Sequence, residues 1–139
     1  MTAAKRSVAL VVQGPDGVLL VRRPDDDESL PGVWGLPAAT LRPGESEREA
    51  LLRAGREKLG VEVEPLEPLG ADEAQRPGHR IEMRDWSARI VAGEPRVPQP
   101  REGTQYVEWR WGDPEQLVPA ARAGSLCARV LLRSVGSGW

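Results

Sequence analysis

The first apolar residues of the chain fall in two short runs separated by turn-forming residues. Residues 7–13 (SVALVVQ) and 18–23 (VLLVRR) are rich in β-branched and aliphatic side chains. The four residues between them, Gly-Pro-Asp-Gly at 14–17, are the types that tight turns favour. The pattern therefore predicts a β-hairpin at the start of the chain.

A loop and then a helix are predicted to follow. Pro and Gly recur every few residues from 24 to 43, which predicts loop with at most short strands. Ser46 and Glu49 have the spacing of a capping box, in which each side chain binds the other residue's backbone amide. C-terminal to the cap, the following four residues lie on one face of the helix: Leu51, Leu52, Gly55 and Leu59. Because Gly60 is a typical terminator, the helix is predicted to span about 47 to 59.

Within this predicted helix, Gly55 costs about 1 kcal/mol relative to Ala, so either another segment approaches its backbone closely or the helix is less stable.

The rest of the pattern predicts strands and a closing helix. Residues 61–69 resemble an edge strand because prolines interrupt them. The remaining predicted segments are a polar loop at 71–78, strands at 80–91 and 106–111, a Pro-rich loop at 93–103 and an amphipathic helix at 125–134. This order predicts one mixed sheet with helices on its faces.

Composition narrows the class of protein. The 139 residues suffice for one core, so a single domain over residues 1–139 is expected. With a formal net charge of −2, binding to duplex nucleic acid cannot rest on bulk positive charge. Cys127 is the one cysteine, and the longest apolar run, residues 8–12, is too short to cross a membrane. We therefore expect a cytoplasmic protein that binds neither duplex nucleic acid nor a membrane, and a homodimer is left open.

The segment at 34–61, WGLPAATLRPGESEREALLRAGREKLGV, carries a recognisable motif. It resembles the box of the Nudix family, G-x5-E-x7-R-E-u-x-E-E-x-G-u, in which u is apolar. The box residues kept at the family spacing are Glu45, Arg53, Glu57, Gly60 and Val61. The chain departs from the box at four positions. It has Ala39 in place of the glycine, Ala54 in place of a glutamate, Gly55 in place of the apolar residue and Lys58 in place of a second glutamate.

The resemblance implies a fold and an activity. The fold is an α/β/α sandwich with a mixed β-sheet between helices. The activity is hydrolysis of a diphosphate linkage in a nucleotide or nucleoside diphosphate derivative, with Mg²⁺ or Mn²⁺ held by carboxylates of the box. Glu45, Arg53 and Gly60 are expected to shape the box rather than to react.

Two departures from the motif bear on the metal. Positions 54 and 58 are four residues apart on one helix face, and here they carry Ala54 and Lys58 instead of carboxylates. Glu57 remains as a candidate metal ligand and catalytic residue, although it could instead pair with Arg53 one turn earlier. The resemblance suggests Glu102 as a second such carboxylate, with a solvated loop acid as the alternative. We therefore expect weakened metal binding and activity.

Basic residues form a second group of candidates. Arg22 and Arg23 end the second predicted strand, where the resemblance places residues near substrate phosphates, and the arginine fork suits phosphate oxygens. They could instead pair with the acidic run at 25–28. Lys58 could contact a phosphate in place of a metal, or it could be a solvated lysine favoured by the helix dipole.

Three functions are compatible with these residues. The first is a Nudix hydrolase weakened by the lost glutamates. The second is a catalytically inactive Nudix-like domain that binds a nucleotide or phosphorylated metabolite through Lys58 and Arg22 or Arg23. The third is a dimerising scaffold. An acid within reach of Glu57 favours the hydrolase, whereas Lys58 facing an open cleft with Arg22 or Arg23 favours the binding domain, and a filled cleft favours the scaffold.

Overall fold

The structure is a computed structural model that describes residues 3–99 and 105–139. Its strands come mainly from the two predicted hairpin segments and from the second half of the chain. They are β1 (Ala3–Gly14), β2 (Gly17–Arg22), β3 (Trp34–Gly35), β4 (Ala38–Thr40), β5 (Glu62–Arg76), β6 (His79–Ala92) and β7 (Glu108–Gly112). The predicted N-terminal hairpin is present, because β1 and β2 pair around residues 13–18.

The sheet is mixed, as predicted. Its strand order is β3-β2-β1-β6-β5, with β4 paired to β1 and β7 paired to β2. β1 and β6 run parallel over ten residue pairs, from Ala3 opposite His79 to Val12 opposite Ala88. The other strand pairs are antiparallel.

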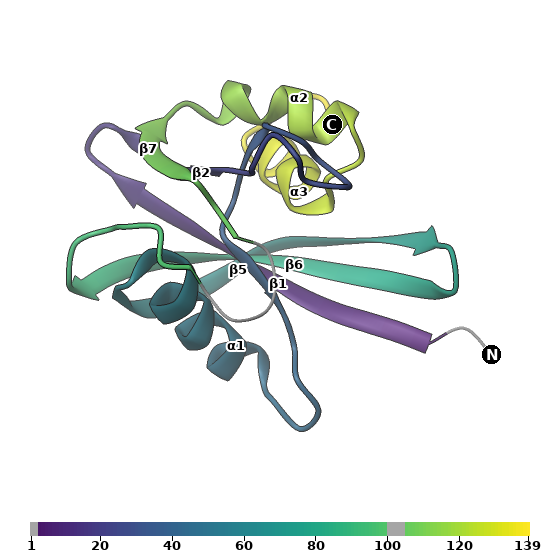
Figure 1. Cartoon of the computed structure of the whole chain (residues 1–139), viewed down its shortest axis with the longest axis horizontal. Helices are drawn as coiled ribbons and strands as arrows, with labels where there is room; N and C mark the ends of the chain where they lie inside the picture. The colour runs from purple at the N-terminus through teal and green to yellow at the C-terminus, as the bar shows by residue number, and fades with distance from the viewer. Residues whose placement is uncertain (1–2, 100–104) are drawn as a thin grey trace.

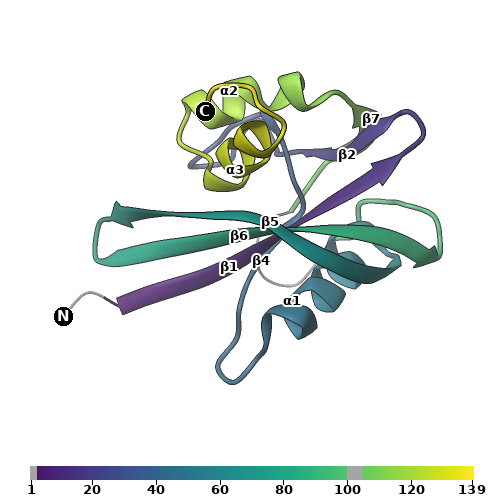
Figure 2. The ribbon, with the colours of Figure 1, turned by 180° about the vertical axis from the view of Figure 1, so that it is seen from behind.

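Helices cover both faces of the sheet. α1 (Glu47–Ala54) continues directly into a π-helical turn, η1 (Gly55–Leu59). A 3₁₀ turn, η2 (Pro114–Leu117), leads into α2 (Val118–Arg122), and α3 (Leu126–Ser134) follows. α1 lies on one side of the sheet and α2 and α3 lie on the other (Figures 1 and 2). The α/β/α sandwich expected from the sequence is therefore confirmed.

Alternation along β1 divides the buried side chains between two cores. Val8, Leu10 and Val12 belong to the core on the α1 side. Ala9 and Val11 belong to the core beneath α2 and α3. Successive side chains of a strand point to opposite faces, so one buried strand supports both layers.

Two details differ from the sequence-based expectation. Residues 71–78 were expected to be a polar loop, but β5 continues to Arg76 and β6 begins at His79. Burial alternates along residues 71–76, but the half-buried positions carry Asp72, Ala74 and Arg76, so apolar and polar residues do not alternate in the sequence. α2 was not among the predicted segments. In the described ranges, the structure holds no helix long and apolar enough to cross a membrane.

Candidate functional site: a basic cleft beside the capped helix

The segment that resembles the Nudix box begins with the predicted cap. The Glu49 backbone N–H donates to Ser46 Oγ at 3.1 Å, and the Ser46 backbone N–H donates to Glu49 Oε1 at 3.0 Å. At the other end Gly60 adopts a φ of 65°, and its N–H donates to the Arg56 carbonyl at 3.1 Å. The helical region thus spans the predicted 47–59, and its last turn is a π-turn, a geometry frequent at functional sites.

Gly55 marks a close approach between this helix and the sheet. A Cβ atom at Gly55 would lie 3.0 Å from Val63 Cγ2 and 3.1 Å from the Val61 carbonyl oxygen. Of the two explanations that the sequence left open, the close approach is the one the structure supports.

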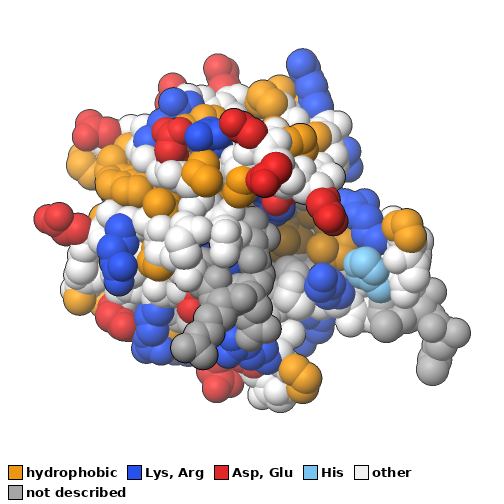
Figure 3. Space-filling model, in the orientation of Figure 1, with side chains coloured by type: hydrophobic (Ala, Val, Ile, Leu, Met, Phe, Trp, Pro, Cys, Tyr) orange, Lys and Arg blue, Asp and Glu red, His pale blue; other side chains and the backbone are white. Residues whose placement is uncertain are grey.

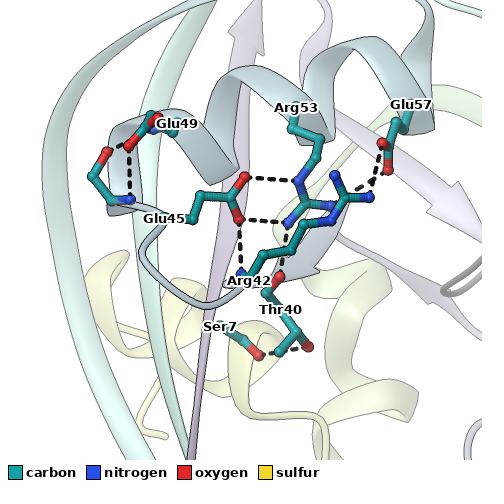
Figure 4. A network of polar contacts seen from close by, with 8 residues as sticks. Ser7, Thr40, Arg42, Glu45, Glu49, Arg53 and Glu57 are labelled. Atoms are coloured by element: carbon teal, nitrogen blue, oxygen red, sulfur yellow. Dashed lines mark hydrogen bonds and ion pairs between the residues drawn. The ribbon is translucent and has the colours of Figure 1, made fainter.

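Arg53 joins the loop before the helix to the sheet (Figure 4). Its Nε and Nη2 donate to the two oxygens of Glu45 at 2.9 and 2.8 Å. Nη2 also donates to the backbone carbonyl of Thr40, in β4, at 2.8 Å. The hydrogen bonds from Arg53 lower the pKa of Glu45 to about 2. This two-bonded ion pair fixes the 42–45 turn against α1.

Glu57 lies between two arginines. Its Oε1 is 3.4 Å from Arg53 Nη1, and its Oε2 is 3.5 Å from Arg42 Nη2. Figure 4 shows both guanidinium groups directed at this carboxylate. Each oxygen of Glu57 therefore already faces a cation.

Lys58 is buried, with 4% of its surface exposed. Its Nζ lies 5.8 Å from the centre of the Tyr106 ring. Burial lowers the pKa of Lys58, and the neighbouring Glu57 carboxylate acts against that shift. Tyr106 is itself buried: its hydroxyl accepts from the Ala38 N–H at 3.3 Å and donates to the Leu36 carbonyl at 3.4 Å. The prediction of a solvated Lys58 is therefore wrong.

These residues border a cleft of about 600 Å³. Its basic lining residues come from strands, loops and the box helix: Lys5, Arg23, Arg42, Arg53, Lys58 and Arg76. Glu57 is the one acidic residue among the described residues that line it. Figure 3 shows a hollow in the surface, with orange side chains inside it and blue ones around it. The cleft therefore presents an excess of positive charge to a ligand.

The other predicted site residues have different positions. Arg23 lines the cleft, and its Nη1 lies 3.3 Å from Asp27 Oδ2. Arg22 is not among the described lining residues; it pairs with Glu108 at 2.7 Å and with Asp25 at 3.1 Å. Both arginines thus make ion pairs of the kind anticipated with the acidic run. Glu102 lies outside the described residues.

The carboxylates that the structure describes do not fit a strongly bound Mg²⁺ or Mn²⁺. Among the residues that the structure describes, no group of three or more His, Cys, Asp or Glu side chains is placed to hold a metal ion. Glu57 is paired with two arginines, and Lys58 stands next to it in the chain. Hard cations need oxygen ligands with little competing positive charge nearby.

Three cleft residues were missed at the level of sequence. Lys5, Arg42 and Arg76 come from β1, the loop after β4 and β5, and no motif connects them. The alternation of β1 places Lys5 on the same strand face as Ser7, but the strand predicted from the sequence begins at residue 7 and so did not include Lys5.

The fold and site define an α/β/α domain in which a capped loop–helix segment borders a basic cleft. A model of the NUDIX domain matches residues 3–133, and the chain belongs to this family. The resemblance found in residues 34–61 is thereby confirmed. Among solved structures, a NUDIX hydrolase from Nitrosomonas europaea is similar with a TM-score of 0.74 and 21% identity, over 97% of this chain and 90% of that one.

Curated relatives carry different activities. An isopentenyl-diphosphate Delta-isomerase of Clavibacter michiganensis is 35% identical over 112 residues, 74% of this chain and 54% of that protein. A NAD-capped RNA hydrolase, NudC, of Pseudomonas aeruginosa is 36% identical over 116 residues, 84% of this chain and 39% of that protein. The chain thus spans about half or less of the length of these relatives, and their names describe both an isomerase and a hydrolase.

Proposed function

We propose that the chain binds a phosphorylated small molecule, a nucleotide or another diphosphate derivative, and that basic side chains hold its phosphates in place of a metal ion. The charge of the cleft carries this proposal, because six basic residues and one acidic residue line it among those described. Charged nitrogen donors form short, strong hydrogen bonds with phosphate oxygens. A cleft of about 600 Å³ also matches the usual size of small-molecule sites.

Lys58 and Arg23 are the predicted phosphate contacts that line this cleft. Burial disfavours the charged form of Lys58, as its lowered pKa indicates. A phosphate in the cleft supplies an opposite charge to that partly desolvated ammonium. Arg22 is not among the described residues that line the cleft, so this proposal does not include it.

The proposal is tested by calorimetry with inorganic pyrophosphate and with ADP, in buffer without divalent metal. We expect Lys58→Met to weaken binding by tenfold or more, because it removes a buried cation from the cleft. Arg56→Gln is the matched control: it removes one charge two residues away, from an exposed side chain that pairs with Glu62 at 2.8 Å. Equal affinities for wild type and Lys58→Met would contradict the proposal.

A second candidate is a weak hydrolase of diphosphate linkages that uses Mg²⁺ or Mn²⁺. Glu57 favours it, because this carboxylate is at the cleft, and the Pseudomonas aeruginosa relative is named as a hydrolase. Glu57 and Glu102 would be its metal-binding and catalytic carboxylates. The test measures phosphate or pyrophosphate release from nucleoside triphosphates, sugar nucleotides and dinucleotides, with Glu57→Gln as the control. Turnover that Glu57→Gln abolishes supports the hydrolase, and no turnover from wild type counts against it.

A further inference from the structure

The cleft has two chemically different ends. Arg53, Glu57 and Lys58 border one end, beside α1 and η1. Residues of β6 and of the start of α3 border the other end, and α1 and α3 lie on opposite sides of the sheet (Figure 2). A ligand whose phosphates lie among the cations of the first end therefore extends its organic part toward the second.

The second end is lined by aliphatic and sulfur-containing side chains: Leu30, Ile81, Met83, Leu126 and Cys127. Met83 and Cys127 are each 8% exposed, so their accessible atoms form the floor of the cleft rather than its rim. Burial raises the pKa of the Cys127 thiol to about 11, which keeps this thiol uncharged at neutral pH. Two cations of the cleft also belong to this end: Lys5, which lies opposite Ile81, and Arg76. The surface offered here favours hydrocarbon over polar groups.

Nucleobases are usually held by stacking on an aromatic ring or an arginine plane. Tyr106 is the one aromatic residue among the described residues that line the cleft, and Lys58 lies over its ring. The tryptophans are elsewhere, packed against the two cores: Trp34, Trp86, Trp109, Trp111 and Trp139. The segments outside the described residues, 1–2 and 100–104, contain no aromatic residue in the sequence.

Ser125 and Arg76, two of the polar residues at this end, are engaged with the protein itself. Ser125 Oγ accepts from the Ala128 N–H at 3.4 Å and lies 3.4 Å from Cys127 Sγ. Arg76 Nη2 donates to the Gly124 carbonyl at 3.0 Å. A base that entered here would exchange its hydrogen bonds with water for few new ones, which is unfavourable.

We infer that the organic part of the ligand is a compact aliphatic chain, so that short alkyl diphosphates bind better than nucleoside diphosphates. This inference rests on the proposed binding of phosphates by the basic end. It assigns the β6–α3 end of the cleft as the site that selects the ligand, with Met83 at its floor.

The test is calorimetry of the full chain with inorganic pyrophosphate, ethyl, butyl and hexyl diphosphate, ADP and CDP. Each methylene group that leaves water raises affinity about fourfold. We therefore expect butyl diphosphate, which has two more methylene groups, to bind about 15-fold more tightly than ethyl diphosphate, and both nucleotides to bind more weakly than butyl diphosphate. Equal affinities for ethyl, butyl and hexyl diphosphate would overturn the inference. Tighter binding of ADP or CDP than of every alkyl diphosphate would also overturn it.

Variants separate this inference from the proposed function. Met83→Gln is expected to remove most of the chain-length dependence and to leave pyrophosphate affinity within twofold. Val91→Gln is the control on the same strand, because Val91 is 52% exposed and does not line the cleft. If Met83→Gln fails to fold, the wild-type series alone decides. Absence of pyrophosphate binding by wild type would contradict the proposed function itself, whereas pyrophosphate binding without chain-length dependence contradicts the aliphatic site alone.

Discussion

Asp85 should make the folded chain less stable as the pH rises. This residue of β6 is fully buried, and neither of its carboxylate oxygens has a hydrogen-bond partner among the described residues. Its neighbours on the adjacent strands are Ala9 and Gly70, which offer no side-chain donor. Burial raises the pKa of Asp85 well above its usual 3.8. The folded chain therefore keeps a proton that the unfolded chain has already released.

The magnitude follows from proton linkage. Between the usual pKa and the raised one, the folded state binds one more proton than the unfolded state, so the free energy of unfolding falls by up to about 1.4 kcal/mol per pH unit. Below the usual pKa both states are protonated and the dependence disappears. From pH 5 to pH 7 the expected loss is up to about 3 kcal/mol. Cys127, which lies nearby, has its pKa raised by burial to about 11 and stays neutral over this range.

Asp85→Asn isolates this effect, because the amide has nearly the same shape and no proton to lose. We expect the variant to match wild type near pH 4 and to be more stable at pH 7 by up to about 3 kcal/mol in urea unfolding. Asp26→Asn, at an exposed position, is the control and should leave the pH dependence unchanged. A difference between Asp85→Asn and wild type that stays constant from pH 4 to 8, or a wild type that is more stable at pH 7, would refute the reasoning.

Three further changes test the helix and the cleft. Arg53→Met should lower the free energy of unfolding by about 2–3 kcal/mol at pH 7, because it leaves Glu45 without its paired cation. Since the pKa of Glu45 is about 2 when folded against a usual 4.5, this difference should shrink as pH falls from 4.5 toward 2 in urea titrations. Gly55→Ala should lower stability by about 1–2 kcal/mol despite the better helix propensity of Ala, since the methyl group meets Val63; a raised melting temperature would argue against that contact. Lys58→Glu changes the charge beside Glu57 by two units, so calorimetry should show Mg²⁺ binding gained and pyrophosphate binding lost; no heat with Mg²⁺ would count against a restored metal site.

The elements that the sequence predicts well are those with local signals. The Gly-Pro-Asp-Gly turn, the Ser46–Glu49 capping box and Gly60 each act on a few neighbouring residues, so the hairpin and the box helix appear where expected. Ser125 caps α3 with a single hydrogen bond, which its side chain accepts from the Ala128 N–H. The β5–β6 hairpin lacked such a signal over residues 71–78, because its side chains there are mostly polar or partly exposed on both faces.

The cleft could be predicted only in part. Glu57, Lys58 and Arg53 belong to a motif with fixed spacing, and all three line the cleft. The parallel pairing of β1 with β6, which brings Lys5 beside Ile81, joins segments more than 70 residues apart and leaves no local trace. The aliphatic end of the cleft depends on that pairing, so its composition could not be read from the chain.

The surroundings of Glu57 connect the missing glutamates to a change in the kind of ligand. In the Nudix box, positions 54, 57 and 58 carry three carboxylates, whereas here Ala54 is buried in the core and Lys58 is a buried cation. Arg42 and Arg53 lie at 3.5 and 3.4 Å from the two oxygens of Glu57, so that the remaining carboxylate balances cations instead of attracting one. A site of net positive charge repels a free divalent metal ion and attracts a phosphate, because both effects come from the Coulomb interaction with the charges of the site. The substitutions therefore remove one ligand class and favour the other, which is why binding of a diphosphate without metal is the function that we propose first.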